Sequence, residues 1–301
     1  MFGVTILGNN SALPAYDRHP TSQVVTLNDE LFLIDCGEGA QMQMTKFKVR
    51  KSRINRIFIS HLHGDHYFGL PGLLTSYGLL GRSQDLHIYA PPQLQKVLSE
   101  IFSVGDTRLP FTIHFHAIYQ PGLLIDEDKF SVECFRVFHR VECFGFLIRE
   151  KRKPRKILKE KIENYDIPHA VFNSIQEGAD YIAPDGSIIR NEQITVANRQ
   201  PCSYAFCADT AYNESLVPIL QNVSMMYHET TYLKAMEEKA ASRFHSTTIQ
   251  AATLARMANA GKLLIGHFSS KYELLDPFLE ETIEVFPQTQ LALEGVTYLI
   301  R

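Results

Sequence analysis

The sequence predicts a layered α/β fold, because short β-rich runs alternate along the chain with stretches of helical periodicity. Strands are expected at residues 4–8 (VTILG), 22–27 (SQVVTL), 31–37 (LFLIDCG) and 56–61 (RIFISH). Helices are expected at residues 93–102 (QLQKVLSEIF) and 247–260 (TTIQAATLARMANA). Two of the strands lead into Asp35 and His61. Loops at strand ends are where sheet-based enzymes place reacting groups, so the predicted sheet is a scaffold for chemistry.

The composition fits a soluble cytoplasmic protein with a sizeable core. The chain has 301 residues, and 45% of them are hydrophobic. No signal peptide and no apolar run of the roughly 20 residues that a membrane span needs are visible. The 5 cysteines are odd in number and lack a C-x-x-C spacing, so buried thiols are expected. The net charge of -3 means that any binding of nucleic acid must rely on local basic residues.

One such basic run stands out in the middle of the chain. Residues 149–161 (REKRKPRKILKEK) hold eight Lys or Arg and two Glu, and little periodicity follows up to about residue 200. No repeat and no Gly/Ser linker divides the chain, so we expect a single domain over residues 1–301. Residues 149–200 are expected to be an insertion that projects from it. The alternative is an ordinary solvated helix and loop.

Four potential metal ligands lie within six residues, directly after the apolar part of the strand at 56–61. They are His61, His63, Asp65 and His66. Clustered imidazoles and a carboxylate compete for solvation, and a divalent cation satisfies them together. His61 and His63 can face one side of an extended segment, while the next two ligands turn toward a second position. The spacing therefore favours two metal ions over a set of packed or surface histidines.

The H-x-H-x-D-H pattern resembles the signature of the metallo-β-lactamase superfamily, and the string HLHGDHYFGLPGLL resembles its ribonuclease Z branch. The resemblance implies an αβ/βα sandwich with an inserted projecting arm. It also implies three further ligands at the ends of strand-like runs, namely His139, Asp209 and His267. By this resemblance His61, His63 and His139 hold one cation and Asp65, His66 and His267 hold the other, with Asp209 between them. The expected cofactors are two divalent metal ions, with zinc as the expected metal.

The resemblance implies a phosphodiester hydrolase. Two cations roughly 3.5–4 Å apart activate a water molecule and neutralise the charge that develops on a phosphate, without a protein nucleophile. Asp65 is expected to orient this water or to accept its proton.

Two further motifs are candidates to supply the proton for the leaving group. His228-Glu229-Thr230-Thr231 and His245-Ser246-Thr247 resemble paired ribonuclease Z motifs, in which the glutamate and the second histidine hold the phosphate and donate the proton. The expected catalytic residues are therefore Asp65, Glu229 and His245. Thr247 and Gln250 have capping-box spacing, which begins a helix, and Gly261 is expected as the residue that ends it.

The resemblance further implies that the enzyme cuts precursor tRNA at its 3′ side, as a homodimer. The basic run would bind the tRNA through phosphates, a contact that positions RNA without reading its sequence. Its expected substrate-binding residues are Lys151, Arg152, Lys153, Arg155 and Lys156. Two departures concern the substrate. Residues 14–19 lack the phosphate-binding lysine common in this loop, and Ile167-Pro168 replaces a Gly-Pro turn of the arm.

Three other functions compete with this interpretation. A small-molecule phosphodiesterase, or a thioester or lactam hydrolase, shares the metal motif but not the Glu229 and His245 motifs. A two-iron oxidoreductase would carry an acidic ligand in place of His63, together with a flavin module. A non-catalytic RNA-binding protein would lack some of the ligands. The remaining histidines match no ligand position and are expected to be structural: His19, His87, His114, His116 and His169.

Overall fold

The computed structural model describes residues 1–301, which form two compact units. The main unit comprises Met1–Asp126, Val132–Ile148 and Cys202–Arg301. The insert unit comprises Glu127–Ser131 and Arg149–Pro201, nearly the same residues as the predicted insertion. None of the helices combines the length and the apolar character that crossing a membrane requires.

Two seven-stranded sheets form the centre of the main unit. The first contains, in spatial order, β20 (Thr297–Leu299), β1 (Phe2–Gly8), β3 (Ser22–Leu27), β4 (Glu30–Cys36), β5 (Ile54–Phe58), β6 (Leu86–Ala90) and β7 (Ile113–Ala117). The second contains β19 (Thr289–Leu291), β17 (Leu263–Gly266), β16 (Met225–Glu229), β15 (Ser203–Cys207), β10 (Phe144–Glu150), β9 (Phe130–Arg136) and β8 (Gly122–Asp126). A separate short pair joins β2 (Asn10–Ser11) and β18 (Phe268–Ser269).

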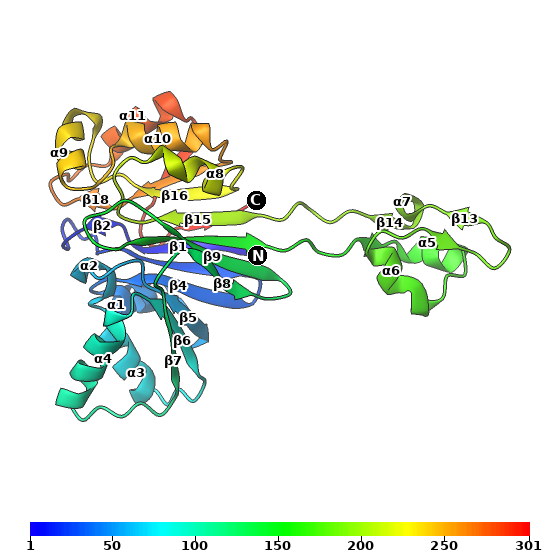
Figure 1. The fold of residues 1–301 in the computed structure, drawn as a ribbon, viewed down its shortest axis with the longest axis horizontal. Coiled ribbons are helices and arrows are strands. Elements are labelled where there is room, and N and C mark those ends of the chain that lie inside the picture. The colour runs from blue at the N-terminus through cyan, green and yellow to red at the C-terminus, as the bar shows by residue number, and fades with distance from the viewer. The chain divides into compact units, whose positions relative to one another are not determined.

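Helices cover the outer faces of both sheets (Figure 1). On the side of the first sheet lie α1 (Ala40–Lys46), α3 (Leu70–Leu79) and α4 (Gln93–Val104), with α2 (Gly64–Tyr67) nearer the middle. On the side of the second sheet lie α8 (Val217–Leu220), α9 (Glu237–Ser242), α10 (Thr248–Met257) and α11 (Asp276–Val285). Short 3-10 turns occur at Lys51–Arg53, Glu214–Leu216 and Lys234–Met236. The four layers are helix, sheet, sheet and helix, as the family resemblance implies.

The layers are held together by apolar packing. Between the first sheet and its helices a core of fully buried side chains includes Leu33, Ile57, Leu73 and Leu94. Between the sheets, the ring of Phe58 on β5 lies 5.3 Å from that of Phe146 on β10. Contacts of this kind exclude water from the interior and supply the main driving force for folding. They fix the two sheets face to face and so fix the loops at their edges.

The strand directions gather the loops that carry chemistry. Strands β4 to β7 are mutually parallel, and so are β15, β16, β17 and β19. The carboxyl ends of parallel neighbours meet at one edge of a sheet, where open α/β folds place their sites. His61, Asp209, Thr230 and His267 all follow such strand ends within a few residues.

The observed elements refine the predicted ones. β3 spans the predicted residues 22–27, but β5 ends at Phe58, so Ser60 and His61 lie beyond the strand. Helix α10 begins at the predicted capping box, in which Thr247 and Gln250 bond each other's backbone N–H. The prediction for Gly261 is wrong. Asn259, with φ 48°, is the left-handed residue after α10, and Gly261 instead packs against the backbone of Ser224.

The insert unit has its own small core and short elements. They are β11 (Lys156–Ile157), α5 (Lys159–Asn164), a 3-10 turn (His169–Val171), α6 (Phe172–Gln176), β12 (Tyr181–Ile182), β13 (Ile188–Ile189), α7 (Asn191–Ile194) and β14 (Thr195–Val196). Its buried cluster consists of Ile162, Ile167, Ile175, Tyr181, Ile189 and Ile194. Asn191 ties the unit together, because its side-chain amide donates to the carbonyl oxygens of Ile175 and Ala179. The hairpin of β12 and β13, the pairing of β11 with β14 and the apolar cluster make this segment a folded module.

Candidate metal centre

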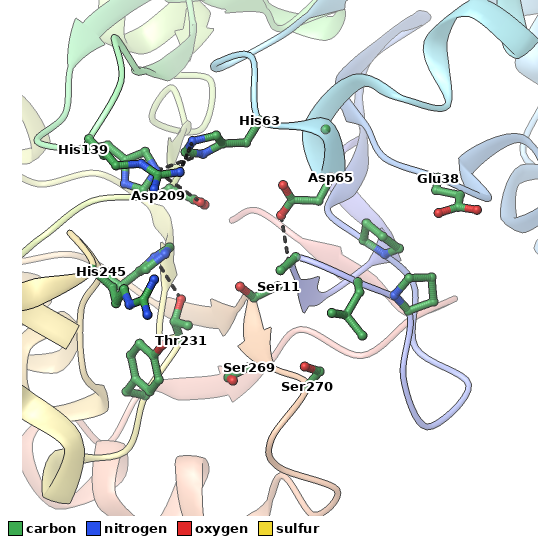
Figure 2. A pocket seen from close by; sticks show the side chains of 18 of the residues that line it. Ser11, Glu38, His63, Asp65, His139, Asp209, Thr231, His245, Ser269 and Ser270 are labelled. Atoms are coloured by element: carbon green, nitrogen blue, oxygen red, sulfur yellow. Dashed lines mark hydrogen bonds and ion pairs between the residues drawn. The ribbon is translucent and has the colours of Figure 1, made fainter. Parts of the chain in front are cut away.

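All seven predicted ligands lie at one cleft of the main unit. The cleft has a volume of about 650 Å³, and four of the seven, His63, Asp65, His139 and Asp209, line it directly. Figure 2 shows His139 and Asp209 on one side of the cleft and Asp65 on the other. The remaining three, His61, His66 and His267, lie in its floor and are almost fully buried.

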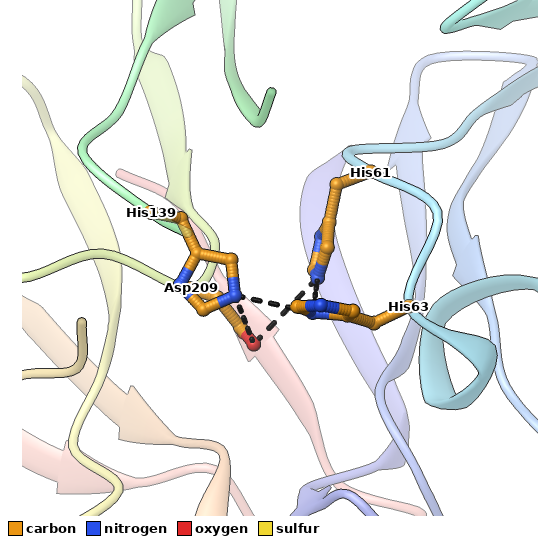
Figure 3. Close-up of side chains that lie close together, drawn as sticks. All are labelled: His61, His63, His139 and Asp209. Carbon is orange, nitrogen blue, oxygen red and sulfur yellow. Dashed lines mark hydrogen bonds and ion pairs between the residues drawn. The ribbon is translucent and has the colours of Figure 1, made fainter. Parts of the chain in front are cut away.

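The first ligand group joins three imidazoles and a carboxylate (Figure 3). The Nδ1 atom of His63 lies 3.0 Å from Nε2 of His61 and 3.1 Å from Nε2 of His139. Oδ2 of Asp209 lies 3.7 Å from Nε2 of His61 and 3.9 Å from Nε2 of His139. Ring nitrogens that face one another at such distances are typical of ligands around a cation.

The second group lies on the other side of Asp209. Nε2 of His66 and Nε2 of His267 lie 3.4 Å and 3.0 Å from Oδ1 of Asp209. Oδ2 of Asp65 lies 3.5 Å from the first of these nitrogens and 3.7 Å from the second, and it accepts a hydrogen bond from the backbone N–H of Ala12. Each oxygen of Asp209 therefore faces a different histidine group.

Hydrogen bonding at the far side of the rings tests whether these residues fit metal ions. Nδ1 of His139 donates to the carbonyl of Phe244, and Nδ1 of His267 donates to the hydroxyl of Thr231. A ring that donates from Nδ1 presents an unprotonated Nε2, which is the form that binds a metal. Three fully buried atoms in the middle of the cluster have no hydrogen-bond partner: His66 Nε2, Asp209 Oδ1 and His267 Nε2. Such orphaned atoms are costly unless a cation satisfies them, so the donor set fits.

The charges of the cluster agree with this fit. Burial, followed by the nearby ring of His66, holds the pKa of His61 well below its usual value, so the ring is neutral. For His66 burial acts in the same direction, but Asp209, Asp65 and Asp35 outweigh it and raise the pKa well above its usual value. The three carboxylates around the ring of His66 create a negative potential that a bound cation would neutralise. The cluster is able to bind metal ions.

Asp35 positions the candidate ligands through hydrogen bonds, a role that the ligand motif alone does not reveal. Its carboxylate accepts hydrogen bonds from Nδ1 of His66 at 2.6 Å, from the backbone N–H of Ser60 at 2.7 Å and from the hydroxyl of Ser60 at 2.8 Å. The hydroxyl of Ser60 in turn lies 3.0 Å from Nδ1 of His61. A carboxylate behind a histidine ligand fixes its ring orientation and raises its basicity. The signal in the sequence is an acidic residue inside the apolar run LFLIDCG.

A second polar group adjoins the ligands. Oε1 of Glu229 lies 2.7 Å from Nδ1 of His245 and accepts the backbone N–H of Thr210, while Oε2 accepts the N–H and the hydroxyl of Thr231. The ring of His245 lies 5.2 Å from that of His139 and 5.5 Å from that of His267. Glu229 is fully buried and His245 faces the cleft. The carboxylate therefore aims the imidazole at the space beside the ligands.

The chain turns sharply just before His245. Phe244 has φ 59°, a left-handed conformation that is uncommon outside glycine, and the backbone N–H of His245 bonds the carbonyl of Ala240 to end helix α9. Burial lowers the pKa of His245, but Glu229 outweighs it and raises the pKa to about 9. The ring thus carries a proton at neutral pH, and cations at the neighbouring ligands would lower this pKa.

Some histidines do not join the site. Nδ1 of His228 bonds the carbonyl of Glu229 in the buried strand β16. His87, His114 and His116 stack on one another across β6 and β7. His19 pairs with Glu294, and His169 lies against Phe172.

The basic residues named from the sequence belong to the insert unit. Arg152, Lys153 and Lys156 are exposed, and Lys151 is half-buried. Arg155 is half-buried, and its Nε donates to the hydroxyl of Thr195 at 2.7 Å, so it also supports the fold of this unit.

Comparison with known proteins finds relatives that match nearly the whole chain. The protein named ribonuclease Z from Porphyromonas gingivalis is 44% identical over 296 residues, covering 97% of this chain and 97% of that protein. The protein of the same name from Parabacteroides distasonis is 40% identical over 297 residues, covering 98% of each. The family model described as anti-Pycsar protein Apyc1 matches residues 2–152.

Solved structures show the same architecture. The short form of human tRNase Z has 26% sequence identity and a TM-score of 0.73, and the match covers 99% of both chains. The metallo-β-lactamase fold protein YhfI from Bacillus subtilis, at 18% identity and a TM-score of 0.69, covers 99% of this chain and 98% of its own. The predicted metallo-β-lactamase sandwich is thereby confirmed. The chain belongs to the ribonuclease Z family, and its residues 2–152 also belong to the sequence family of the anti-Pycsar protein Apyc1.

Proposed function

We propose that the protein is a metal-dependent endoribonuclease that hydrolyses a phosphodiester at the 3′ side of precursor tRNA. The observation that carries the proposal is the position of the Glu229–His245 pair beside the two ligand groups that share Asp209. The thiolate from a thioester would leave without protonation, whereas the alkoxide from a phosphodiester needs a proton donor at this point. The names of the ribonuclease Z relatives and of human tRNase Z supply the substrate.

The ligand groups define which residues would hold the metal ions. His61, His63 and His139 would hold one cation, Asp65, His66 and His267 the second, and Asp209 would contribute one oxygen to each. Two divalent cations would supply an activated water and neutralise negative charge on the scissile phosphate. Zinc is the proposed metal, because neutral imidazoles and carboxylates are its usual ligands.

The protein's own groups complete the reaction. Asp65, held by the N–H of Ala12, lines the cleft and would orient the attacking water and accept its proton. His245 would donate its proton to the 3′-oxygen as the P–O bond breaks, while Glu229 stabilises the imidazolium before transfer. The nucleotide before the cut then leaves with a 3′-hydroxyl, and the trailer keeps a 5′-phosphate.

The insert unit would bind the body of the tRNA. Its exposed cations Arg152, Lys153 and Lys156 would contact phosphates, while its separate core keeps them on a folded surface. The homodimer and the cytoplasmic location expected from the sequence stay predictions.

The first test is cleavage of a 3′-extended tRNA precursor by the purified protein. We expect one cut, a 3′-hydroxyl on the tRNA fragment and a 5′-phosphate on the trailer. Chelation should abolish cleavage, and added zinc should restore it. A 2′,3′-cyclic phosphate product, or activity that persists after complete removal of metal, would contradict the mechanism.

The second test concerns His245. General acid catalysis typically contributes about 10²–10⁴-fold, so His245→Ala should lower kcat on precursor tRNA by that order with metal content unchanged. Bis-p-nitrophenyl phosphate should suffer a much smaller loss, because nitrophenolate leaves without protonation. His114→Ala, at the exposed histidine stack, is the matched control. Equal losses on the two substrates would exclude proton donation, and loss of metal would identify His245 as a ligand.

The third test concerns the insert unit. Combined replacement of Arg152, Lys153 and Lys156 by Ala should raise KM for precursor tRNA and lower the slope of log affinity against log salt by about 1 for each phosphate that the variant no longer neutralises. Lys96→Ala on α4 removes an exposed cation of the main unit and should change neither quantity. An equal fall in precursor and bis-p-nitrophenyl phosphate hydrolysis would show instead that the segment supports the catalytic site.

A further inference from the structure

The cleft that carries the ligands has two chemically different walls. One wall is formed by the N-terminal loop and its neighbours, with Leu13, Pro14, Pro20 and Phe68, and its charged residue away from the ligands is the acidic Glu38. Figure 2 shows His245 across the cleft from Glu38. The ring of Tyr232 lies on the side of His245, and Arg140, Lys239 and Arg243 also line the cleft. Apart from the ligands themselves, positive charge therefore lines one side of the cleft and negative charge the other.

The cations of the second wall adjoin the proposed proton donor. Nζ of Lys239 lies 5.7 Å from the centre of the Tyr232 ring, and that ring lies 6.3 Å from the ring of His245. Arg243 is exposed and stands two residues before His245, at the end of helix α9. The turn at Phe244 that aims His245 into the cleft thus also brings Arg243 to its rim.

The arginine of the N-terminal loop, Arg18, is not free to bind a phosphate in the cleft. The guanidinium of Arg18 donates to the side-chain oxygen of Asn10 at 3.1 Å, to the carbonyl of Glu273 at 2.7 Å and to the carbonyl of Tyr272. These bonds hold residues 14–19 against the loop after β18 and leave the guanidinium outside the residues that line the cleft. A phosphate on this wall would meet apolar side chains, the hydroxyl of Ser11 and the carboxylate of Glu38, but no cation.

We propose that Lys239 and Arg243 bind the phosphate that precedes the scissile bond, so that the RNA crosses the cleft in one direction. The inference rests on the proposed function. His245 protonates the 3′-oxygen of the nucleotide before the cut, so that nucleotide lies on the side of His245 and its own 5′-phosphate continues onto the cationic wall. The trailer follows the apolar wall and receives little electrostatic binding energy there. Lys239 and Arg243 are specificity-determining residues that favour RNA over small phosphodiesters.

Replacement of either residue by Ala tests the contact. Hydrogen bonds to charged groups are strong enough that each replacement should raise KM for a 3′-extended tRNA precursor about tenfold, while kcat changes less than threefold. Each should also lower the slope of log affinity against log salt by about 1. Lys234→Ala removes an exposed cation five residues from Lys239 that does not line the cleft, and it should leave both parameters at their wild-type values.

Substrates with one uncharged methylphosphonate linkage locate the contact. Neutralising the linkage before the scissile bond should weaken wild-type binding and remove most of the further effect of Lys239→Ala and Arg243→Ala. Neutralising the linkage after the scissile bond should leave the effect of the variants intact. If neutralising the linkage after the scissile bond removed the effect of the variants instead, the proposed direction of the RNA would be reversed. If the variants lost the same affinity for both modified substrates, the substitutions would have disturbed the fold.

The outcomes separate this inference from the function on which it rests. Wild-type protein that fails to cleave the precursor overturns both. Wild-type protein that cleaves it, with variants whose KM is unchanged or whose kcat alone falls, overturns only the assignment of Lys239 and Arg243.

Discussion

The carboxylate of Asp209, set between two pairs of buried imidazoles, is the constraint on which the rest of the site depends. Its two oxygens face His61 and His139 on one side and His66 and His267 on the other. Buried polar atoms without hydrogen-bond partners destabilise the folded state, and three such atoms lie together around Asp209. The sandwich folds around a set of groups that only positive charge satisfies. Binding metal ions would therefore stabilise the folded state as well as enable the reaction.

Both side-chain packing and strained backbone conformations hold the candidate ligands in position. Asp35, Phe244 and His267 all have φ between 54° and 60°, where side chains other than glycine are strained. Such conformations persist when the surrounding structure over-determines them, and they cluster at functional sites. Here hydrogen bonds supply that support: the backbone N–H of Ser60 donates to the carboxylate of Asp35, and Nδ1 of His139 donates to the carbonyl of Phe244. The ligands are thus preorganised by the layer beneath them.

The cluster of candidate ligands, the layered fold and the capping box of α10 could be predicted, because sequence motifs carry them. His61, His63, Asp65 and His66 stand close together in the sequence, and the family resemblance implies His139, Asp209 and His267. The roles of Asp35 and Arg18 could not be predicted, since each is defined by partners far away in the chain, such as Ser60 and the carbonyls of residues 272–273. The end of α10 differs from the prediction because Asn259, and not Gly261, adopts the left-handed conformation that glycine usually takes at this position. Motifs of neighbouring residues therefore predict the candidate site well, whereas they do not predict the hydrogen bonds between distant residues that hold it in place.

The most direct test of the central claim is anomalous diffraction at the zinc absorption edge, from crystals of protein purified with its native metal and supplemented with zinc. Two anomalous peaks are expected, one beside each oxygen of Asp209, the first among His61, His63 and His139 and the second among Asp65, His66 and His267. A single peak, or peaks that lie away from Asp209, would contradict the account of a shared two-metal centre.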